Sequence, residues 1–511
     1  MRIVRDLCGR YSGISALVIL VLLVIGVYAQ VNDFDFIELD DSEYVINNLD
    51  LKKGLTVDGI VWAFSENERG SFWQPLVWIS FLLDYEISGK AISPDVFHLG
   101  NLFYHLLNTM LCFLLFRRLT NSIWSSLLVA IVFSVHPQRV ESVAWITERK
   151  DVLFTLFGFL SLIVYLRYSD TKKTRTYFFS LFFFLLSLMS KAMAVALPCI
   201  MLLLDFWPLQ RIKSWTDLKS AIYKKIPFFI LTFVFSVLTF VLQSRGAIKT
   251  FEEIPLLLRS ENAVVSYLSY IVDYFRPVNL CVIYPFPDHI DLWRVLLSGL
   301  VIGCISIYAL YTMKKYPWVF TGWFWYVISI FPVIGFCQSG PQAMADRFMY
   351  FPHMGISLIL VMALQKCYLR IIHICVVILM GVMAAACFIQ VGYWENNQKL
   401  LQLAIDVTGE NLIAERCLGA ELYRKGDIQG AHKHFLNALR MNPEGNIEYY
   451  NMGLLYFASN KTDMAEFYFK KSLEIDPSYI NAHNNLGITL INANKPEEAE
   501  YHFRMVEQLR E

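Results

Sequence analysis

The chain has 511 residues, of which 56% are hydrophobic and 17% are charged, and its formal net charge is zero. Soluble proteins usually have about a quarter of their residues charged. A nucleic-acid-binding protein needs a basic excess to neutralise phosphates. The composition therefore excludes a wholly soluble protein, argues against a nucleic-acid partner, and indicates a large part that dissolves in lipid.

Eleven apolar runs are candidates for membrane-spanning helices, each of which needs about 20 apolar residues. The first is predicted to be an uncleaved span, because Tyr28-Ala29-Gln30 is a poor signal-peptide cleavage site. The apolar stretch 261–280 contains Asp273 and Arg276 and is expected on the membrane surface. The eleven runs are 13–30, 97–116, 122–136, 150–168, 176–191, 193–209, 226–243, 293–313, 317–336, 354–366 and 369–392.

Lysine and arginine clusters test this count, because basic residues are enriched in cytoplasmic loops. With eleven spans all six clusters fall on one side of the membrane. This places the N-terminus in the cytoplasm and the C-terminus outside, with the acidic and aromatic loops 31–96, 137–149, 244–292 and 337–353 also outside. The six clusters lie at 2–10, 117–118, 167–175, 211–225, 314–315 and 366–370.

The last hundred residues repeat with a period of 34, which is typical of tetratricopeptide repeats. We expect a membrane domain over 1–392, a linker over 393–411 and three repeats over 412–445, 446–479 and 480–511. The repeating positions are Gly419, Gly453 and Gly487; Ala431, Ala465 and Ala499; Phe435, Phe469 and Phe503; and Pro443 and Pro477.

Three asparagines of the repeats are candidates for binding an acceptor protein or peptide. Asn451 and Asn485 occupy the same repeat position, and Asn484 is adjacent to the second of them. Side-chain amides in register can hydrogen-bond a peptide backbone without reading its sequence. The alternative is that all three are solvated surface residues.

Two adjacent carboxylates follow the first apolar run. Asp40 and Asp41 lie in the first outer loop and could supply a general base and its helper, since each acid raises the pKa of its neighbour. A solvated acidic loop is the alternative reading of this pair. Further outer segments, at 136–151, 190–193 and 345–352, carry cations at the membrane boundary. Such cations can bind a lipid phosphate, anchor a helix at the interface or form structural ion pairs.

The order of these pieces resembles the membrane proteins with tetratricopeptide tails whose animal members are the transmembrane O-mannosyltransferases targeting cadherins. The resemblance covers nearly the whole chain, although Ala192 and the short tail depart from the family pattern. The matching segments are Asp40-Asp41-x-x-Tyr44-Val45-x-x-Asn48, Trp73-Gln74-Pro75-Leu76, Phe97-His98-Leu99-x-Asn101, His136-Pro137-x-x-Val140-Glu141-Ser142-Val143-Ala144-Trp145, Arg149-Lys150-Asp151, Ser190-Lys191-x-Met193 and Ala345-Asp346-Arg347-x-x-Tyr350.

The resemblance implies an all-α, GT-C-like membrane bundle followed by an α-solenoid, and an inverting glycosyltransferase activity. A sugar, mannose or another hexose, would pass from a polyprenyl or dolichyl monophosphate to a hydroxyl, such as that of a protein Ser or Thr, on the non-cytoplasmic face. Asp40 would be the base with Asp41 beside it, and no metal or other cofactor is implied. The donor phosphate would be bound by cations among Arg139, Arg149, Lys150, Lys191 and Arg347.

Two other classes of function stay open at this stage. The chain could be a non-catalytic membrane scaffold that recruits partners for envelope or surface-polymer assembly, or a transporter of lipid-linked sugars. A transporter should carry charges deep within its spans, where this chain has few, Asp205 being one near a span end. The simple tail favours a bacterial inner membrane, with the endoplasmic reticulum as the alternative.

Overall fold

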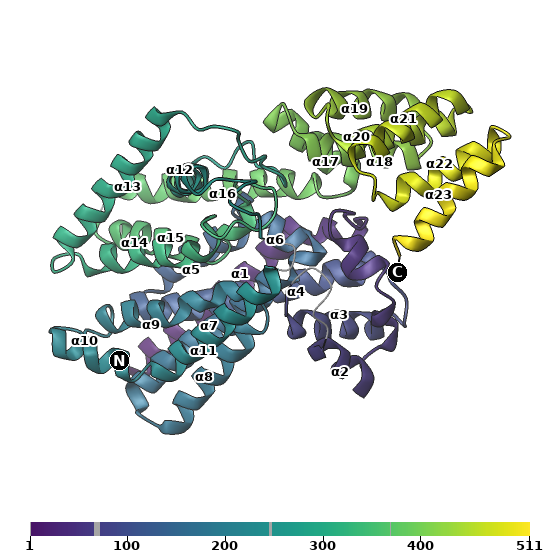
Figure 1. Cartoon of the computed structure of the whole chain (residues 1–511). Coiled ribbons are helices and arrows are strands. Elements are labelled where there is room, and N and C mark those ends of the chain that lie inside the picture. The colour runs from purple at the N-terminus through teal and green to yellow at the C-terminus, as the bar shows by residue number, and fades with distance from the viewer. Residues whose placement is uncertain (1, 66–71, 245–247, 368, 511) are drawn as a thin grey trace. The chain divides into compact units, whose positions relative to one another are not determined.

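The computed structural model describes residues 2–65, 72–244, 248–367 and 369–510 (Figure 1). These ranges are mainly helical and contain no β-strand, apart from an isolated bridge between Ile248 and Ser339. The chain forms two compact units. The first, called here the membrane unit, comprises Met1–Leu280 and Phe286–Asn396, and the second, the repeat unit, comprises Cys281–Pro285 and Asn397–Glu511.

The membrane unit is built from helices α1 to α16, which are joined by both short turns and longer loops. The helices are α1 (Arg2–Tyr28), α2 (Val57–Ser65), α3 (Pro75–Ile87), α4 (Pro94–Thr120), α5 (Ile123–Val135), α6 (Val140–Ala144), α7 (Arg149–Thr171), α8 (Thr174–Leu188), α9 (Leu197–Phe206), α10 (Trp215–Tyr223), α11 (Ile226–Gln243), α12 (Leu256–Phe275), α13 (Leu292–Thr312), α14 (Pro317–Ile330), α15 (His353–Leu364) and α16 (Arg370–Gly392). Single turns of 3-10 or π helix lie at Ala29–Asp33, Ser42–Ile46, Leu49–Lys53, Pro137–Arg139, Ile146–Glu148, Ala192–Ala196, Phe331–Val333 and Asp346–Met349.

Each of the eleven predicted apolar runs coincides with an apolar helix. Among the described residues, six helices are long and apolar enough to cross a membrane, or seven if the pair Ile123–Val135 and Pro137–Ala144, bent by 61°, is one span. The other four are shorter, at 10–17 residues. The helical membrane fold is thus confirmed, whereas the count of eleven spans stays a prediction. The six long spans are Ser12–Asp33, Pro94–Thr120, Ile146–Thr171, Ile226–Gln243, Leu292–Thr312 and Ile371–Gly392.

Small polar residues hold α7 and α8 together. The two helices are joined through Lys172, which adopts the left-handed conformation (φ 54°) that ends α7. Ser161 and Ser180 donate hydrogen bonds to each other's backbone carbonyls at 2.8 and 2.9 Å, and the Ser187 hydroxyl donates to the Phe154 carbonyl at 2.7 Å. Close approach through small residues is how helices pack where the surrounding lipid is as apolar as their side chains.

The repeat unit contains three antiparallel helix pairs preceded by one more helix, which lies within the predicted linker (Figure 1, green to yellow). Its segment Cys281–Pro285 is fixed by the buried Asn411, whose Nδ2 donates to the Ile283 carbonyl at 3.0 Å. The helices are α17 (Asn397–Thr408), α18 (Leu412–Arg424), α19 (Ile428–Met441), α20 (Asn446–Ala458), α21 (Thr462–Ile475), α22 (Ile480–Asn492) and α23 (Pro496–Gln508).

The glycine and phenylalanine positions of the 34-residue period meet inside each helix pair. A Cβ atom added to Gly453 would lie 2.5 Å from the Phe469 ring. A Cβ atom added to Gly419 would lie 2.5 Å from the Phe435 ring, and one added to Gly487 would lie 2.7 Å from the Phe503 ring. Each glycine therefore leaves room for the aromatic ring of the following helix. The glycine and phenylalanine positions repeat every 34 residues because each helix pair needs this close packing.

Candidate functional site

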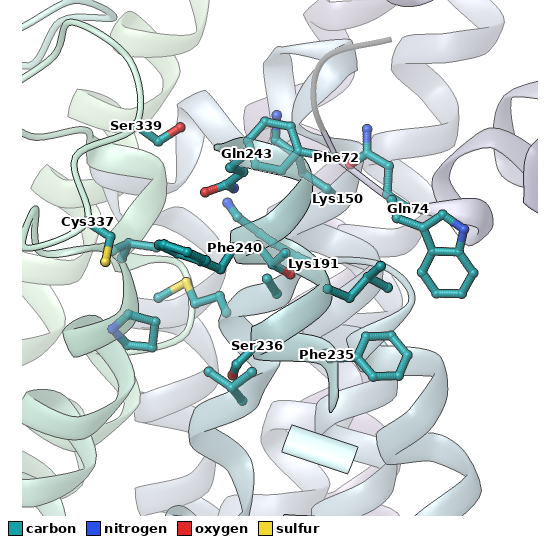
Figure 2. Close-up of a pocket in the computed structure, with 18 of the residues that line it drawn as sticks. Phe72, Gln74, Lys150, Lys191, Phe235, Ser236, Phe240, Gln243, Cys337 and Ser339 are labelled. Carbon is teal, nitrogen blue, oxygen red and sulfur yellow. The ribbon is translucent and has the colours of Figure 1, made fainter. Parts of the chain in front are cut away.

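A cavity of about 580 Å³ lies in the membrane unit. It is lined by residues 72–74, the segment 188–195 that leads from α8 toward α9, residues of α11 between Phe233 and Gln243, and parts of the loop 332–348. Figure 2 shows Gln74, Lys150 and Lys191 at this hollow together with Phe235, Ser236 and Phe240 of α11. The walls are mostly apolar and aromatic, so a hydrocarbon chain can occupy most of this volume.

Three cations from distant parts of the sequence line this cavity. Lys150, Lys191 and Arg347, called here the cation cluster, are each 13% exposed. All three contact the buried Glu148, whose carboxylate oxygens lie 3.1 Å from Lys150 Nζ, 3.7 Å from Lys191 Nζ and 3.2 Å from Arg347 Nε. One carboxylate thus holds the three cations at a common site.

Two further buried acids fix the positions of these cations. Asp151 Oδ1 lies 2.5 Å from Lys191 Nζ, and Glu141 accepts hydrogen bonds from the Arg347 backbone nitrogen at 2.8 Å and from its guanidinium. Burial lowers the pKa of Arg347, but the carboxylates of Glu141 and Glu148, with a smaller contribution from Asp40, raise it above its usual range. Arg347 therefore remains charged at every physiological pH.

The adjacent aspartates of the first loop have different environments. Asp41 is fully buried and accepts hydrogen bonds from the Ile37 nitrogen at 2.9 Å and from the nitrogen (3.1 Å) and hydroxyl of Thr147. Burial raises the pKa of Asp41 to about 7, although these hydrogen bonds oppose the shift. Asp40 is half-buried, and its carboxylate has no hydrogen bond or ion pair in the described ranges. Neither aspartate is a lining residue of the cavity, but Asp40 lies within electrostatic reach of Arg347.

The other two predicted phosphate-binding cations are not brought to the cavity. Arg149 is fully buried, with Nη2 2.6 Å from Asp84 Oδ2 and 2.7 Å from the Phe97 carbonyl, so it joins α3, α4 and α7. Arg139 donates to the backbone carbonyls of Met349 and Tyr350 and lies over the Phe133 ring. Both guanidinium groups hold protein segments together.

Sequence reasoning missed the acids that organise the cluster and one amide of the cavity. Glu141 and Asp151 stand inside the matching segments and Glu148 lies between them, and their alternation with basic residues was the available signal. Gln74 lines the cavity, is 3% exposed, and its Nε2 has no hydrogen-bond partner among the described residues. An unpaired buried donor is costly, so this amide is suited to a polar group of a bound ligand.

The three predicted peptide-binding asparagines are half-buried on two helices of the repeat unit. Asn451 lies on α20, and Asn484 and Asn485 lie on α22. Asn485 Nδ2 already donates to the Tyr450 hydroxyl at 2.8 Å. The side chains of Asn451 and Asn484 have no recorded partner within the described part of the chain, so their amides are available to a ligand.

Comparison with known proteins bears on both units. Tetratricopeptide-repeat family models match residues 447–479 and 468–501. Protein O-mannosyl-transferase TMTC4 of Homo sapiens is 31% identical over 188 residues, 33% of this chain and 25% of that protein. Protein O-mannosyl-transferase F38B6.6 of Caenorhabditis elegans is 24% identical over 459 residues, which is 85% of this chain and 64% of that protein. The chain is a homologue of the TMTC protein O-mannosyl-transferases.

The similarity to the TMTC proteins has a limited extent. The chain spans a quarter of the human TMTC4 protein and about half of human TMTC3, to which it is 22% identical over 84% of its own length. Among solved structures, the crystal structure of MamA protein has a TM-score of 0.21 and 22% identity, covering 22% of this chain and 61% of that chain.

Proposed function

We propose that this TMTC homologue is a glycosyltransferase that moves a sugar, mannose or another hexose, from a polyprenyl or dolichyl monophosphate to a hydroxyl. The observation that carries the proposal is the cation cluster at an apolar cavity bordered by α11. Phe233 and Phe240 of α11 line the cavity and are also 69% and 58% exposed. Exposed aromatic residues on a spanning helix face lipid, so α11 gives a lipid-linked donor a lateral route to the cavity.

The cation cluster is suited to the phosphate of such a donor. Lysine ammonium and arginine guanidinium groups form charge-assisted hydrogen bonds to phosphate oxygens. Transfer releases the polyprenyl or dolichyl phosphate, whose negative charge grows as its bond to the sugar breaks, and fixed cations stabilise that charge. Because Glu148, Glu141 and Asp151 hold the cations in place before the ligand arrives, little reorganisation is needed.

We assign the base to Asp40 and a positioning role to Asp41. The acceptor hydroxyl would give its proton to the Asp40 carboxylate while its oxygen bonds to the anomeric carbon. The bond from that carbon to the phosphate oxygen breaks on the opposite side, so the configuration inverts. Asp41 is unsuited to this task, because its oxygens are buried and already accept hydrogen bonds from Ile37 and Thr147.

The length of α7 supports placing this chemistry on the non-cytoplasmic face. Lys150 lies in the first turn of α7 and Lys172 immediately follows its end, so their Cα atoms are separated by about 33 Å at 1.5 Å per residue. That distance matches a bilayer core of about 30 Å. The basic cluster 167–175 marks the cytoplasmic end. The C-terminal repeats would then be non-cytoplasmic and bind the acceptor protein, in a bacterial inner membrane or, in a eukaryote, the endoplasmic reticulum.

A non-catalytic scaffold is the second candidate. One observation favours it: the three cations of the cluster face three buried acids, as they would in a purely structural ion network. A scaffold would retain its function without a carboxylate at position 40.

Glycoproteomics separates the two candidates. Cells that lack the protein are compared with cells that carry the wild type, Asp40→Asn or Glu43→Gln, the last being a matched control because Glu43 is an exposed acid of the same loop. We expect a set of glycopeptides to disappear in the deletion and in Asp40→Asn, and to return with the wild type and Glu43→Gln. Glycan profiles that are identical in all four strains would overturn the proposal.

A further inference from the structure

The short helix α10 carries a large apolar surface that no described residue of the membrane unit covers. Only Ala221 of its nine residues is buried, whereas Trp215, Ile222 and Tyr223 are 67%, 39% and 74% exposed. Isolated helices of this length are marginal in water. A capping box between Ser214 and Asp217 starts the helix, but the exposed apolar face requires another surface to bury it.

The same face of α10 carries positive charge. Trp215, Lys219 and Tyr223 are spaced four residues apart and therefore lie on one side of the helix, with Lys219 Nζ 5.7 Å from the Trp215 ring. The only acid of the helix, Asp217, is engaged by the backbone nitrogens of Lys213 and Ser214. This mixture of aromatic rings and lysines is typical of helices that lie in the membrane–water interface.

Cations from three turns gather near α10. Lys172 follows the end of α7, Arg211 precedes α10 and donates from Nη2 to the Ser169 carbonyl of α7 at 2.6 Å, and Lys224 follows α10. The Lys224 backbone carbonyl accepts a hydrogen bond from the Tyr177 hydroxyl at 2.8 Å, which ties this turn to the start of α8. Desolvation and the charges of Arg211 and Lys224 lower the pKa of Lys172, so like charges are crowded here.

The nearby acids are already paired. Asp205 contacts the buried Lys225 and lies 3.5 Å from Arg211, and Asp170 pairs with Arg118. Lys172 and Lys224 have no ion pair within the described ranges. An anion that bridges them would relieve the repulsion among the cations.

We propose that α10 and the turn residues Lys172 and Lys224 form a binding site for an anionic phospholipid. The headgroup phosphate lies between the two lysines, while Trp215, Ile222 and Tyr223 enter the acyl-chain boundary. The site is separate from the cavity, because Lys172 and Lys150 stand at opposite ends of α7. An anionic membrane surface attracts basic residues of this kind, and the aromatic face selects a lipid over a free anion.

The test uses the full chain in nanodiscs and follows hydrogen exchange of peptides covering 213–224. Nanodiscs of phosphatidylcholine are compared with nanodiscs of equal parts phosphatidylcholine and phosphatidylglycerol, and with phosphatidylcholine plus inorganic phosphate. We expect exchange to slow by roughly tenfold with phosphatidylglycerol only. In the double variant Lys172→Gln and Lys224→Gln this difference should vanish.

The matched control is the double variant Lys52→Gln and Lys90→Gln, which removes two exposed lysines of the first loop. It should retain the full effect of phosphatidylglycerol. Equal exchange in the two lipid compositions would overturn the proposal. So would equal protection by inorganic phosphate, which would indicate an anion site without lipid selectivity. Native mass spectrometry gives a second readout, with fewer phosphatidylglycerol molecules retained by the Lys172 and Lys224 variant.

Discussion

Thr147 donates two hydrogen bonds to Asp41, one from its backbone nitrogen at 3.1 Å and one from its hydroxyl. These bonds tie the first loop to the turn that leads into α7. Because Glu148 follows Thr147 directly and Lys150 comes two residues later, the same contact sets the distance between Asp40 and the cation cluster. Asp41 thus positions the cation cluster indirectly, through its hydrogen bonds to Thr147.

The first prediction concerns the pH dependence of Asp41. Its pKa is about 7 in the fold and roughly 3.9 in an unfolded chain. The stability due to the neutral carboxyl is therefore fully present below about pH 4 and is lost as the pH rises through about 7. Asp41→Asn cannot ionise and does not show this loss, although its amide hydrogen-bonds Thr147 less well, at a cost of about 1–3 kcal/mol.

Thermal unfolding of both proteins between pH 5 and pH 8 checks this. The wild-type midpoint should fall relative to that of Asp41→Asn as the pH rises. A constant difference between the two midpoints across this range would contradict a pKa of about 7 for Asp41.

The second prediction concerns phosphate binding by Lys150. Its ion pair is with Glu148, which keeps Lys191 and Arg347 when Lys150 is removed. Lys150→Gln should therefore fold normally but lose a charge-assisted contact worth about 1.5–3 kcal/mol, or roughly 10- to 100-fold in affinity for a polyprenyl monophosphate. Titration of the purified protein with a short-chain polyprenyl monophosphate measures this, with Lys52→Gln as the control. Unchanged affinity in Lys150→Gln would show that Lys150 does not bind the phosphate.

The third prediction separates binding from stability at Gln74. Its Nε2 is buried and has no partner in the part of the chain that the structure describes, so Gln74→Leu should leave the free energy of unfolding within about 0.5 kcal/mol of the wild type or raise it. Affinity for a sugar-bearing polyprenyl phosphate should fall, because a donor to the ligand has been removed. Paired measurements of unfolding and ligand affinity check this. A loss of stability without a change in affinity would make Gln74 purely structural.

The fourth prediction concerns the packing of the repeats. Gly453→Ala places a methyl group 2.5 Å from the Phe469 ring, and such overpacking should destabilise the repeat unit by about 1–3 kcal/mol. Adding Phe469→Leu should recover part of the loss, since contacting residues couple. Gly303→Ala is the control, because nothing lies within 4 Å of its added Cβ. Equal unfolding curves for Gly453→Ala and the wild type would contradict the packing account.

Features that depend on local pattern could be predicted from the sequence. The apolar runs mark the helices of the membrane unit, and the 34-residue period marks the helix pairs because each glycine must admit a phenylalanine ring. The break at Pro137 and the short helices α8, α9, α14 and α15 left the span count open, because hydropathy does not give the bend or the depth of a helix.

The grouping of the site residues could not be predicted from the sequence. Lys150, Lys191 and Arg347 meet only because α7, the segment after α8 and the 345–350 turn converge on Glu148. Arg149 adjoins Lys150 in sequence, yet helical rotation directs it to Asp84 instead. The contrast between Asp40 and Asp41 likewise depends on how the loop turns at Ser42–Ile46, where one neighbour is buried and the other is left half-exposed.

The fifth prediction tests the central claim that Asp40 is the base of a sugar transfer at this cavity. The measurement is the rate at which purified full-length protein transfers hexose from a short-chain polyprenyl monophosphate to an acceptor peptide found by glycoproteomics. Asp40→Asn should lower kcat by about 10²- to 10⁴-fold while leaving donor affinity unchanged, and Glu43→Gln should transfer at the wild-type rate. Transfer by Asp40→Asn at the wild-type rate would contradict the account.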